Sequence, residues 1–260
     1  MSITNLVALE RQEQIVEQIN SVKRTTVAEL SHRFQVSEAT IRRDLAVLAQ
    51  RGLVRRMHGG VLRAEGFFAS TEIPVLQRQG LHSEAKERIG AAAAKLIRDG
   101  ETLFITGGST TLMMARHLAG HRNLTIITDS ILVVQELFHQ KYHRCMILGG
   151  MIDYEEMAVR GPIARHMMGQ FHVDKVILGA RAISIERGIS LETPEETELF
   201  RIAMNSGRET LLITDSTKFD QSAFMYLAPI NAVHTLVTDT GLDQSLAQQI
   251  RELNIELILA

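Results

Sequence analysis

The feature that most constrains the fold is an alternation, from Ser83 onward, between short apolar runs and amphipathic stretches. Strands that alternate with helices lie parallel, and a parallel sheet is covered by helices on both faces. The helical stretch at 83–98 carries a small-residue face, Ile89 to Ala94, suited to close packing. The sequence therefore predicts an α/β domain over residues 83–260, with strands at 102–106, 124–128, 144–148, 173–179, 210–214, 234–238 and 255–259.

Polar turns follow several of these strands. In open α/β sheets the ligand lies outside the carboxyl ends of the strands, so these turns are the candidate binding residues. The most informative turn follows 102–106 and opens a helix: it consists of Thr106, Gly107, Gly108, Ser109, Thr110 and Thr111. Glycines let a backbone approach a ligand, and the first N–H groups of a helix attract an anion. The turn lacks the lysine of a nucleotide-hydrolysing P-loop, so we expect a phosphate site or, alternatively, a plain helix cap.

Two further strand ends carry charged side chains. Asp129 follows the strand at 124–128, and Lys218 follows the strand at 210–214. An ammonium group is a point charge suited to phosphate, although an exposed surface lysine would show the same spacing.

The N-terminal residues have a different pattern. Apolar positions from Leu9 to Ile19 indicate a helix, which we expect to end at Asn20-Ser21. Thr26 and Glu29 have capping-box spacing and predict a second, short helix. After a turn at Gln35-Val36, Ser37 can cap a third helix that runs to about Gln50 and buries Ile41, Leu45 and Leu48.

Two short helices joined by a minimal turn form a helix-turn-helix, here at about 25–44, whose second helix enters the major groove of DNA. The segment 53–61 predicts a hairpin that turns at Gly59-Gly60 and would grip phosphate as a wing. Asp44 is expected to orient one of the two neighbouring arginines rather than touch DNA. The predicted DNA-binding residues are Thr26, Ser37, Glu38, Thr40, Arg42, Arg43, Arg55, Arg56 and His58.

The distribution of charge agrees with this reading, although the net charge of the chain is -2. Residues 1–63 carry 10 basic and 6 acidic side chains, whereas residues 64–260 carry 18 and 24. A basic module on an acidic body is typical of a nucleic-acid binder. The alternative is a three-helix protein-binding domain in which the arginine pair is a solvated face.

These residues resemble a known family. Ser37-x-x-Thr40-Ile41-Arg42-Arg43-Asp44-Leu45, with Arg56-x-His58-Gly59-Gly60, is similar to the DeoR family of bacterial regulators of sugar metabolism. The resemblance continues through Gly107 to Thr111, Gly149-Gly150, Gly161, Leu178 to Ala180 and Asp215-x-x-Lys218-Phe219. It implies that 37–45 is the recognition helix. It also implies that the second domain is similar in fold to ribose-5-phosphate isomerase and binds a phosphorylated sugar through Gly108, Ser109, Thr110 and Thr111, with Lys218 nearby.

The chain departs from the family pattern at three places. Thr106 stands where many members have Asp, Asp129 where Asn is usual, and Arg181-Ala182 where Asp-Gly is common. These changes predict an effector with a different or additional charged group, such as an acid sugar phosphate that pairs with Arg181.

Two other functions are possible for a chain with these residues. A sugar-phosphate isomerase fused to a DNA-binding domain would need a base and a cation, for which Glu195, Glu196 and Lys218 are the candidates. Arg181, where the resembling isomerases carry acidic residues, weakens that alternative. Metal sensing has little support because the ten histidines are scattered, and His139 and His143 lie at a helix-to-strand boundary. No catalytic residue, metal site or cofactor is predicted.

The predicted organisation is a winged helix-turn-helix at 1–63, an extended linker at 64–82 that contains Pro74, and an effector-binding and oligomerisation domain at 83–260. A single cysteine, Cys145, and an N-terminus without a secretory pattern lead us to expect a cytoplasmic protein. The expected partners are double-stranded operator DNA, a small phosphorylated sugar and further copies of the chain. We expect no membrane contact, and a homodimer or homotetramer, because one recognition helix reads only a few base pairs.

Overall fold

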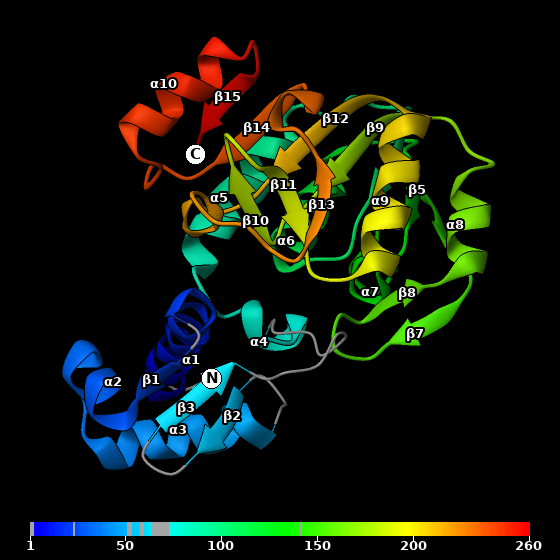
Figure 1. Cartoon of the computed structure of the whole chain (residues 1–260). Helices are drawn as coiled ribbons and strands as arrows, with labels where there is room; N and C mark the ends of the chain where they lie inside the picture. The colour runs from blue at the N-terminus through cyan, green and yellow to red at the C-terminus, as the bar shows by residue number, and fades with distance from the viewer. Residues whose placement is uncertain (1–2, 23, 51–53, 58–59, 64–72, 141) are drawn as a thin grey trace. The chain divides into compact units, whose positions relative to one another are not determined.

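The structure is a computed structural model that describes residues 3–22, 24–50, 54–57, 60–63, 73–140 and 142–260. The chain divides into two compact units, Met1–Leu81 and His82–Ala260 (Figure 1). Within the described residues, no helix is both long and apolar enough to cross a lipid bilayer.

The first unit is a winged helix-turn-helix, as predicted. Its helices pack on a core that includes Ile15, Leu30, Ile41, Leu45 and Val61. A small antiparallel sheet in the order β1-β3-β2 completes it. The elements are α1 (Ile3–Val22), β1 (Arg24–Thr26), α2 (Val27–Phe34), α3 (Glu38–Gln50), β2 (Val54–Met57), β3 (Gly60–Arg63) and α4 (Val75–Arg78).

Two boundaries differ from the sequence expectation. The first helix continues through Asn20-Ser21 to Val22, because these residues lower helix stability by only about 0.7 kcal/mol each at most. The end of the expected linker is not extended: Pro74 caps the short helix α4, where its missing N–H has no helical partner to lose. Val75 and Leu81 are fully buried, so residues 73–81 pack as part of a folded unit.

The second unit contains the predicted parallel sheet. Seven strands are hydrogen-bonded in the order β15-β14-β12-β9-β4-β5-β6, and every neighbouring pair is parallel. Each of the seven predicted strand positions is confirmed. The strands are β4 (Thr102–Ile105), β5 (Thr125–Thr128), β6 (Arg144–Ile147), β9 (Val173–Leu178), β12 (Gly207–Ile213), β14 (Thr235–Thr238) and β15 (Glu256–Leu259).

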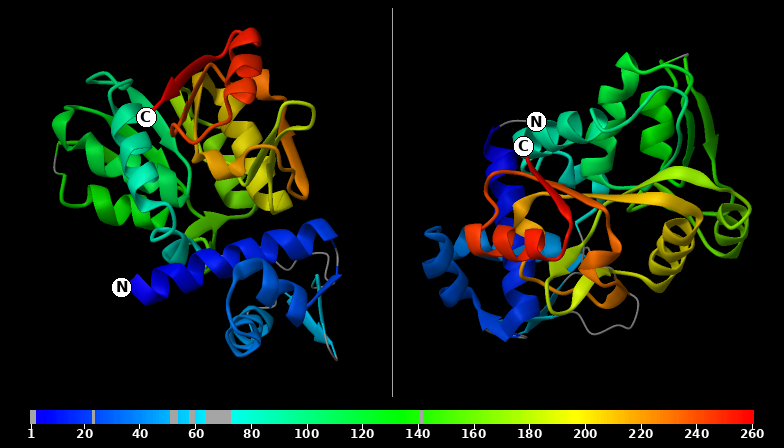
Figure 2. Two further views of the ribbon diagram at one scale, coloured as in Figure 1. Left: turned by 90° about the vertical axis from the view of Figure 1, so that its left-hand side faces the viewer. Right: turned by 90° about the horizontal axis from the view of Figure 1, so that it is seen from above.

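Helices cover both faces of this sheet. In Figure 1, α9 lies in front of the sheet and α5 and α6 lie behind it, and Figure 2 shows the two layers from other sides. The apolar core between α9 and the sheet includes Phe104, Val176, Leu199, Phe200 and Leu212. The helices are α5 (Ser83–Ala94), α6 (Ser109–Arg116), α7 (Ile131–Leu137), α8 (Pro162–Met168), α9 (Pro194–Ser206) and α10 (Gln244–Glu252), with short 3-10 turns η1 (His117–Gly120), η2 (Ser216–Lys218) and η3 (Ile230–Ala232).

Two small antiparallel additions were not predicted. One is the hairpin of β7 (Met151–Asp153) and β8 (Ala158–Arg160), and the other is the sheet of β10 (Ala182–Ser184), β11 (Gly188–Leu191) and β13 (Met225–Ala228). Both lie after strands of the main sheet, so they surround the ends where a ligand would bind.

The strand order reverses in the middle of the sheet. The chain runs outward from β4 to β5 and β6, then returns to the other side of β4 and continues through β9, β12, β14 and β15. The point of reversal lies between β4 and β9. Such a switch point separates two loops that leave the sheet in opposite directions, and ligands bind in the crevice between them.

Candidate nucleic-acid interface and effector site

The helix-turn-helix is held by local hydrogen bonds that its sequence encodes. Thr26 Oγ1 accepts from the backbone N–H of Glu29, and the Glu29 carboxylate accepts from the N–H of Thr26, which confirms the capping box. Gln35 closes α2 in the left-handed conformation with φ 51°. Ser31 Oγ then donates to the carbonyl of Val36 at 2.6 Å and fixes the turn.

Helix α3 has one buried and one exposed face. Ile41, Leu45 and Leu48 are almost completely buried, as predicted. Arg42 and Arg43 are exposed on the other face. At the start of the helix, Ser37 Oγ accepts from the backbone N–H of Thr40 at 3.2 Å and lies 2.9 Å from the Thr40 hydroxyl. The exposed carboxylate of Glu38 accepts from Arg42 at 2.9 Å.

Asp44 has a partner different from the one predicted. It binds neither of the neighbouring arginines but accepts from Arg11 Nε at 2.6 Å and from Gln12 Nε2 at 2.9 Å, both on α1. The prediction was wrong because Asp44 lies on the buried face of α3, whereas the arginines point the other way. The pair therefore fixes α3 against α1, so the angle of the exposed face depends on a helix remote in sequence.

The predicted wing is a hairpin with defined register. β2 and β3 are antiparallel, with Val54 opposite Arg63 and Met57 opposite Gly60. Val54 and Val61 are buried in the core of the unit. Arg55 and Arg56 lie on β2, while His58 falls outside the described residues. β1 pairs with β3 and adds a third strand that the sequence did not predict.

In the second unit, the predicted effector residues follow four strands that are neighbours in the main sheet, in the order β12-β9-β4-β5. Thr106, Asp129, Arg181 and Lys218 follow β4, β5, β9 and β12 respectively, so all four stand at the carboxyl edge of the sheet. Thr106 joins the two sides of the switch point, because its hydroxyl accepts from the backbone N–H of Gly179 at 3.2 Å. The topology thus brings these loops together, as the sequence predicted.

The glycine turn after β4 presents the start of α6 to this edge. Gly108 has φ 149°, a backbone conformation that favours glycine, and no side chain caps the helix. The Thr111 hydroxyl instead donates back to the Gly108 carbonyl at 3.1 Å. Uncapped N–H groups at a helix start are a suitable set of donors for an anion.

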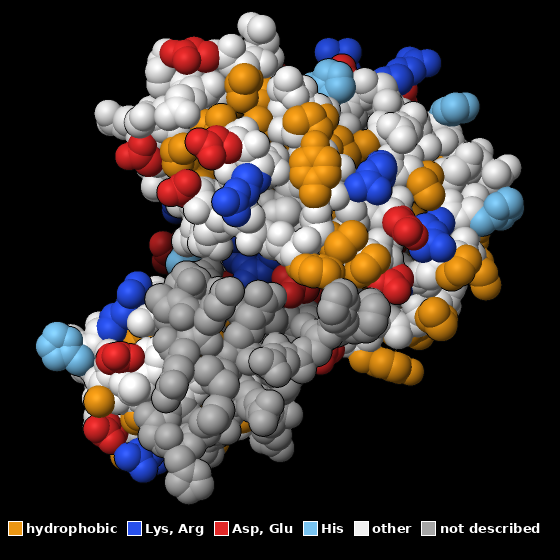
Figure 3. Space-filling model, in the orientation of Figure 1, with side chains coloured by type: hydrophobic (Ala, Val, Ile, Leu, Met, Phe, Trp, Pro, Cys, Tyr) orange, Lys and Arg blue, Asp and Glu red, His pale blue; other side chains and the backbone are white. Residues whose placement is uncertain are grey.

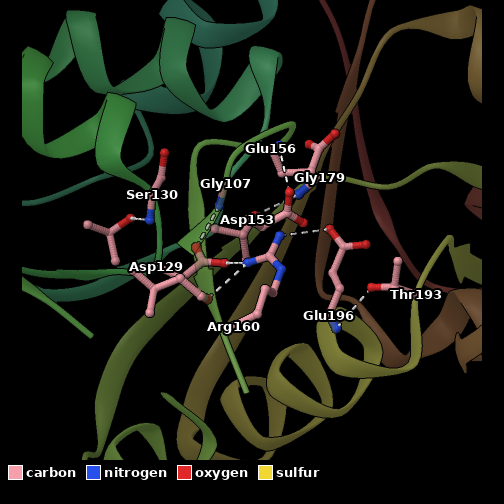
Figure 4. A network of polar contacts seen from close by, with 12 residues as sticks. Gly107, Asp129, Ser130, Asp153, Glu156, Arg160, Gly179, Thr193 and Glu196 are labelled. Atoms are coloured by element: carbon pink, nitrogen blue, oxygen red, sulfur yellow. Dashed lines mark hydrogen bonds and ion pairs between the residues drawn. The ribbon is translucent and has the colours of Figure 1, made fainter. Parts of the chain in front are cut away.

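Asp129 does more than line the turn. It is fully buried, accepts from the backbone N–H of Gly107 at 2.7 Å, and forms an ion pair with Arg160 of β8. Arg160 also lies 3.5 Å from Glu196 of α9, so it stands between two carboxylates (Figure 4). Burial alone would lower the pKa of Arg160, but the carboxylates of Asp129, Glu196, Glu156 and Asp153 together outweigh it and raise that pKa, which keeps the guanidinium charged.

Lys218 belongs to a second charged cluster, at the end of β12. Asp215 is almost completely buried, and Thr217 donates to it through its backbone N–H at 3.2 Å. Burial alone would raise the pKa of the Asp215 carboxyl, but Lys218 and Lys86 of α5 outweigh it and hold the pKa below its ordinary value. Both lysines are themselves buried, so this corner of the site combines two cations with one carboxylate.

Arg181 is held close to the same edge. Its backbone N–H donates to the carbonyl of Ser190 at 3.2 Å, and only 9% of the residue is exposed. The loop that carries it leads directly into β10, which bridges to Phe219 next to Lys218. The order of the loops therefore places the turn that carries Arg181 between the turn of β4 and that of β12.

Sequence reasoning missed Arg160 and Lys86. Arg160 precedes Gly161-Pro162 and reads as a surface residue, and only the docking of β8 beside β5 brings it to Asp129. The one available signal was the unusual Asp129, since a buried carboxylate requires a cationic partner. Lys86 lies on an amphipathic helix where a charged residue attracts no notice.

A helix-turn-helix with two exposed arginines on its second helix, followed by a parallel-sheet domain with an uncapped helix start at its switch point, defines a ligand-responsive regulator of transcription. The chain belongs to the DeoR family. Residues 11–66 match the DeoR-like helix-turn-helix domain, and residues 81–240 match the DeoR C terminal sensor domain.

Relatives match over nearly the whole chain. The transcriptional repressor AccR of Agrobacterium fabrum is 33% identical over 233 residues, which cover 89% of this chain and 90% of that protein. The repressor CsqR of Escherichia coli is 31% identical and covers 100% of this chain and 98% of its own. The glycerol-3-phosphate regulon repressor of Escherichia coli is 30% identical, with 96% and 98% covered.

Solved structures offer only a distant likeness. Ribose 5-phosphate isomerase A of Methanocaldococcus jannaschii has 15% identity and a TM-score of 0.39, and covers 53% of this chain and 54% of that one. A likeness of this size says nothing about activity. Because residues 81–240 match a sensor domain and the relatives are repressors, the chain is a transcriptional regulator and not an isomerase.

Proposed function

We propose that this protein represses a carbohydrate-utilisation operon by binding its operator, and that a phosphorylated sugar or sugar acid controls the binding. The supporting observation is the glycine turn at the switch point, whose uncapped helix start lies in a domain of the family's sensor type. One relative is named for the glycerol-3-phosphate regulon and another for the aga operon, which favours a sugar-derived phosphorylated effector.

In this proposal, α3 reads the major groove. Arg42 and Arg43 reach base edges from the exposed face, since arginine reads guanine through two hydrogen bonds. Glu38, which now accepts from Arg42, can hold that arginine in one orientation. The remaining contacts go to phosphates, where Thr26, Ser37 and Thr40 offer hydroxyls and Arg55, Arg56 and His58 form the wing.

The effector lies across the switch point. Its phosphate is bound by Gly108, Ser109, Thr110 and Thr111 at the start of α6, and Lys218 adds a cation. Thr106, Gly107 and Asp129 hold the glycine turn in position through the hydrogen bonds from Gly179 to Thr106 and from Gly107 to Asp129. Arg181 pairs with an additional acidic group of the effector, because a guanidinium binds a carboxylate through two parallel hydrogen bonds.

The division of labour follows the chain. Residues 1–63 bind DNA, 64–82 connect the domains, and 83–260 bind the effector and associate with further copies in the cytoplasm. A dimer or tetramer would present two recognition helices to repeated half-sites. The effector changes the affinity for DNA only if it binds the competent and incompetent arrangements with different affinity.

Electrophoretic mobility shift with the gene's own upstream DNA, titrated with sugar phosphates, tests the proposal as a whole. Among variants, Arg42→Ala and Arg43→Ala should weaken specific binding more than non-specific binding. Arg55→Ala and Arg56→Ala should weaken both and reduce the salt dependence by about one charge each. Four variants with the same behaviour would contradict the division between reading helix and wing.

The effector assignment is tested with Arg181→Ala against neutral and acidic sugar phosphates by calorimetry. Affinity for acidic ligands should fall by about tenfold or more, whereas neutral ligands should be little affected. Arg187→Ala, at an exposed arginine of the neighbouring turn, serves as the control. An equal loss for both ligand classes would rule out an acid-specific role for Arg181.

A further inference from the structure

The centre of the parallel sheet and its β6 edge differ in how much of each strand is exposed. Its central strands β4 and β9 are buried, but at the β6 edge all four residues are exposed. Of these four, only Arg144 is charged, whereas Met146 and Ile147 are 42% and 39% exposed. Edge strands of proteins that stay monomeric are usually protected by charges, proline or a covering element. β6 has little protection of this kind.

The backbone of β6 is open on its outer side. Arg144 and Leu148 donate their N–H groups to Leu124 and Thr128 on the β5 side. Because successive residues of a parallel ladder point to opposite sides, Cys145 and Ile147 direct their N–H and C=O groups outward. The edge thus offers hydrogen-bonding groups and apolar side chains together.

Apolar side chains continue from β6 onto the elements that follow it. Met151 and Ile152 on β7 are 69% and 49% exposed, and Ile163 on α8 is 61% exposed. Ile163 lies close to Gly149, with Cγ2 3.5 Å from the position that a Cβ would take there. Figure 3 shows hydrophobic side chains gathered over the β7 hairpin and beside α8. We call this surface the β6 face; its exposed apolar residues, on β6 and on the elements that follow it, are Met146, Ile147, Met151, Ile152, Tyr154 and Ile163.

We propose that the β6 face is the surface on which a second copy of this chain docks. Its six large side chains together expose apolar surface on the order of 600 Å², since each is between about two fifths and four fifths exposed and a whole large side chain presents about 150–250 Å². A stable protein interface covers about 800 Å² on each partner, whereas the largest apolar patch of a typical monomer is smaller. A self-complementary patch of this size closes a symmetric dimer.

The β6 face is physically continuous with the effector turn. Met151 on β7 is opposite Arg160 on β8, and Arg160 pairs with the Asp129 that holds Gly107. β8 is also hydrogen-bonded along its backbone, since Val159 donates to the Asp129 carbonyl at 2.7 Å. Insofar as the proposed function is right, a ligand that displaces the glycine turn would also displace the docking surface.

The test is the assembly state of the full chain without DNA or effector, so that its failure leaves the DNA and ligand assignments untouched. Ile147→Glu and Met151→Glu should weaken association by about tenfold or more in sedimentation velocity, because each places a charge in the apolar contact. Leu259→Glu is the matched control: Leu259 is also 39% exposed and also ends an edge strand, β15, at the opposite side of the sheet. It should associate like the wild type.

Three results would overturn the proposal: a wild-type chain that stays monomeric at high concentration, variants that all associate alike, or dissociation by Leu259→Glu alone. Circular dichroism checks that each variant is folded. If Ile147→Glu does not fold, Met151→Glu, at a more exposed hairpin position, decides the question. Cys145 gives an independent readout, since its alkylation should be faster in Met151→Glu than in wild type; equal rates would contradict burial of β6 by a partner.

Discussion

Asp129 and Arg160 are a buried pair at the centre of the sensor domain. The Asp129 carboxylate is fully buried, and Arg160 is 8% exposed at its side chain. A charge in such a position is tolerated only with a partner, and the loss of one member leaves the other unpaired. This pair therefore links the loop after β5 to the hairpin that flanks it.

Substitution of Asp129 by Asn should lower the free energy of unfolding of the sensor unit by about 3 kcal/mol, because Arg160 loses its strongest carboxylate partner and keeps the weaker influence of Glu196, Glu156 and Asp153. Urea unfolding measures the change. In the matched control, Glu198→Gln removes the exposed partner of Arg165 and should cost less than about 1 kcal/mol. Equal losses in the two variants would mean that burial does not set the strength of the Asp129 pair.

Asp215 makes stability depend on pH. Its pKa in the folded chain lies below the ordinary value of 3.8 because Lys218 and Lys86 outweigh burial. The stabilisation is therefore present above pH 3.8 and is lost as the pH falls below it toward the folded pKa. Asp215→Asn should be less stable than wild type at pH 7, and the difference in urea-unfolding free energy should shrink in acid. A constant difference from neutral to acidic pH would contradict this assignment; Asp220→Asn, at an exposed carboxylate nearby, is the control.

At the scale of the elements, α5 and α6 are packed very closely at Gly90. The position that a Cβ would take at Gly90 lies 2.7 Å from the backbone of Met113 and Met114 on α6. This close approach fixes α6, and with it the glycine turn at the start of that helix. The small-residue face predicted at 89–94 has this role.

Gly90→Ala should therefore push α6 away from α5 and lower the free energy of unfolding by about 1–3 kcal/mol. Gly120→Ala, where a Cβ meets nothing within 4 Å, should be neutral within about 0.5 kcal/mol. Thermal unfolding distinguishes the two. If Gly90→Ala were as stable as wild type, α5 and α6 would be able to move apart without loss of stability, and the close contact at Gly90 would not fix α6.

The sequence predicts the long elements better than the short ones. Seven apolar runs separated by helical stretches specify the parallel sheet, and capping residues such as Thr26 mark helix starts. By contrast, β7, β8 and β10 have only three residues each, too few to show a period. They form because a neighbouring backbone offers hydrogen bonds, as Asp129 does for β8.

The candidate site shows the same limit. Glycines and hydroxyls of the turn after β4 can be predicted because they are consecutive and follow a strand. Arg160 lies 31 positions after its partner Asp129, and Lys86 lies on a separate helix, α5. Only tertiary packing brings these two side chains to the candidate site. The error for Asp44 has the same origin, since its partner Arg11 is 33 residues away.

At the scale of the whole molecule, the β6 face and the helix-turn-helix should act together. A second copy supplies a second recognition helix, and simultaneous binding of two half-sites exceeds the affinity for one by about 100-fold or more. In Met151→Glu, affinity for a complete operator should fall by about that factor at fixed salt, measured by fluorescence anisotropy. Binding to a single half-site should be unchanged. A loss on the half-site too would place the defect in the DNA-binding unit instead of the assembly.

The bond between Thr106 and Gly179 spans 73 positions of the chain. The two halves of the switch point therefore meet only when β4 and β9 have paired, and we expect this contact to form late in folding because a long loop must close first. A ligand held across that seam finds no binding site in the earlier, partly folded chain. Such a ligand would leave the rate of folding almost unchanged and slow the rate of unfolding, so each folded copy would persist longer when the ligand is bound.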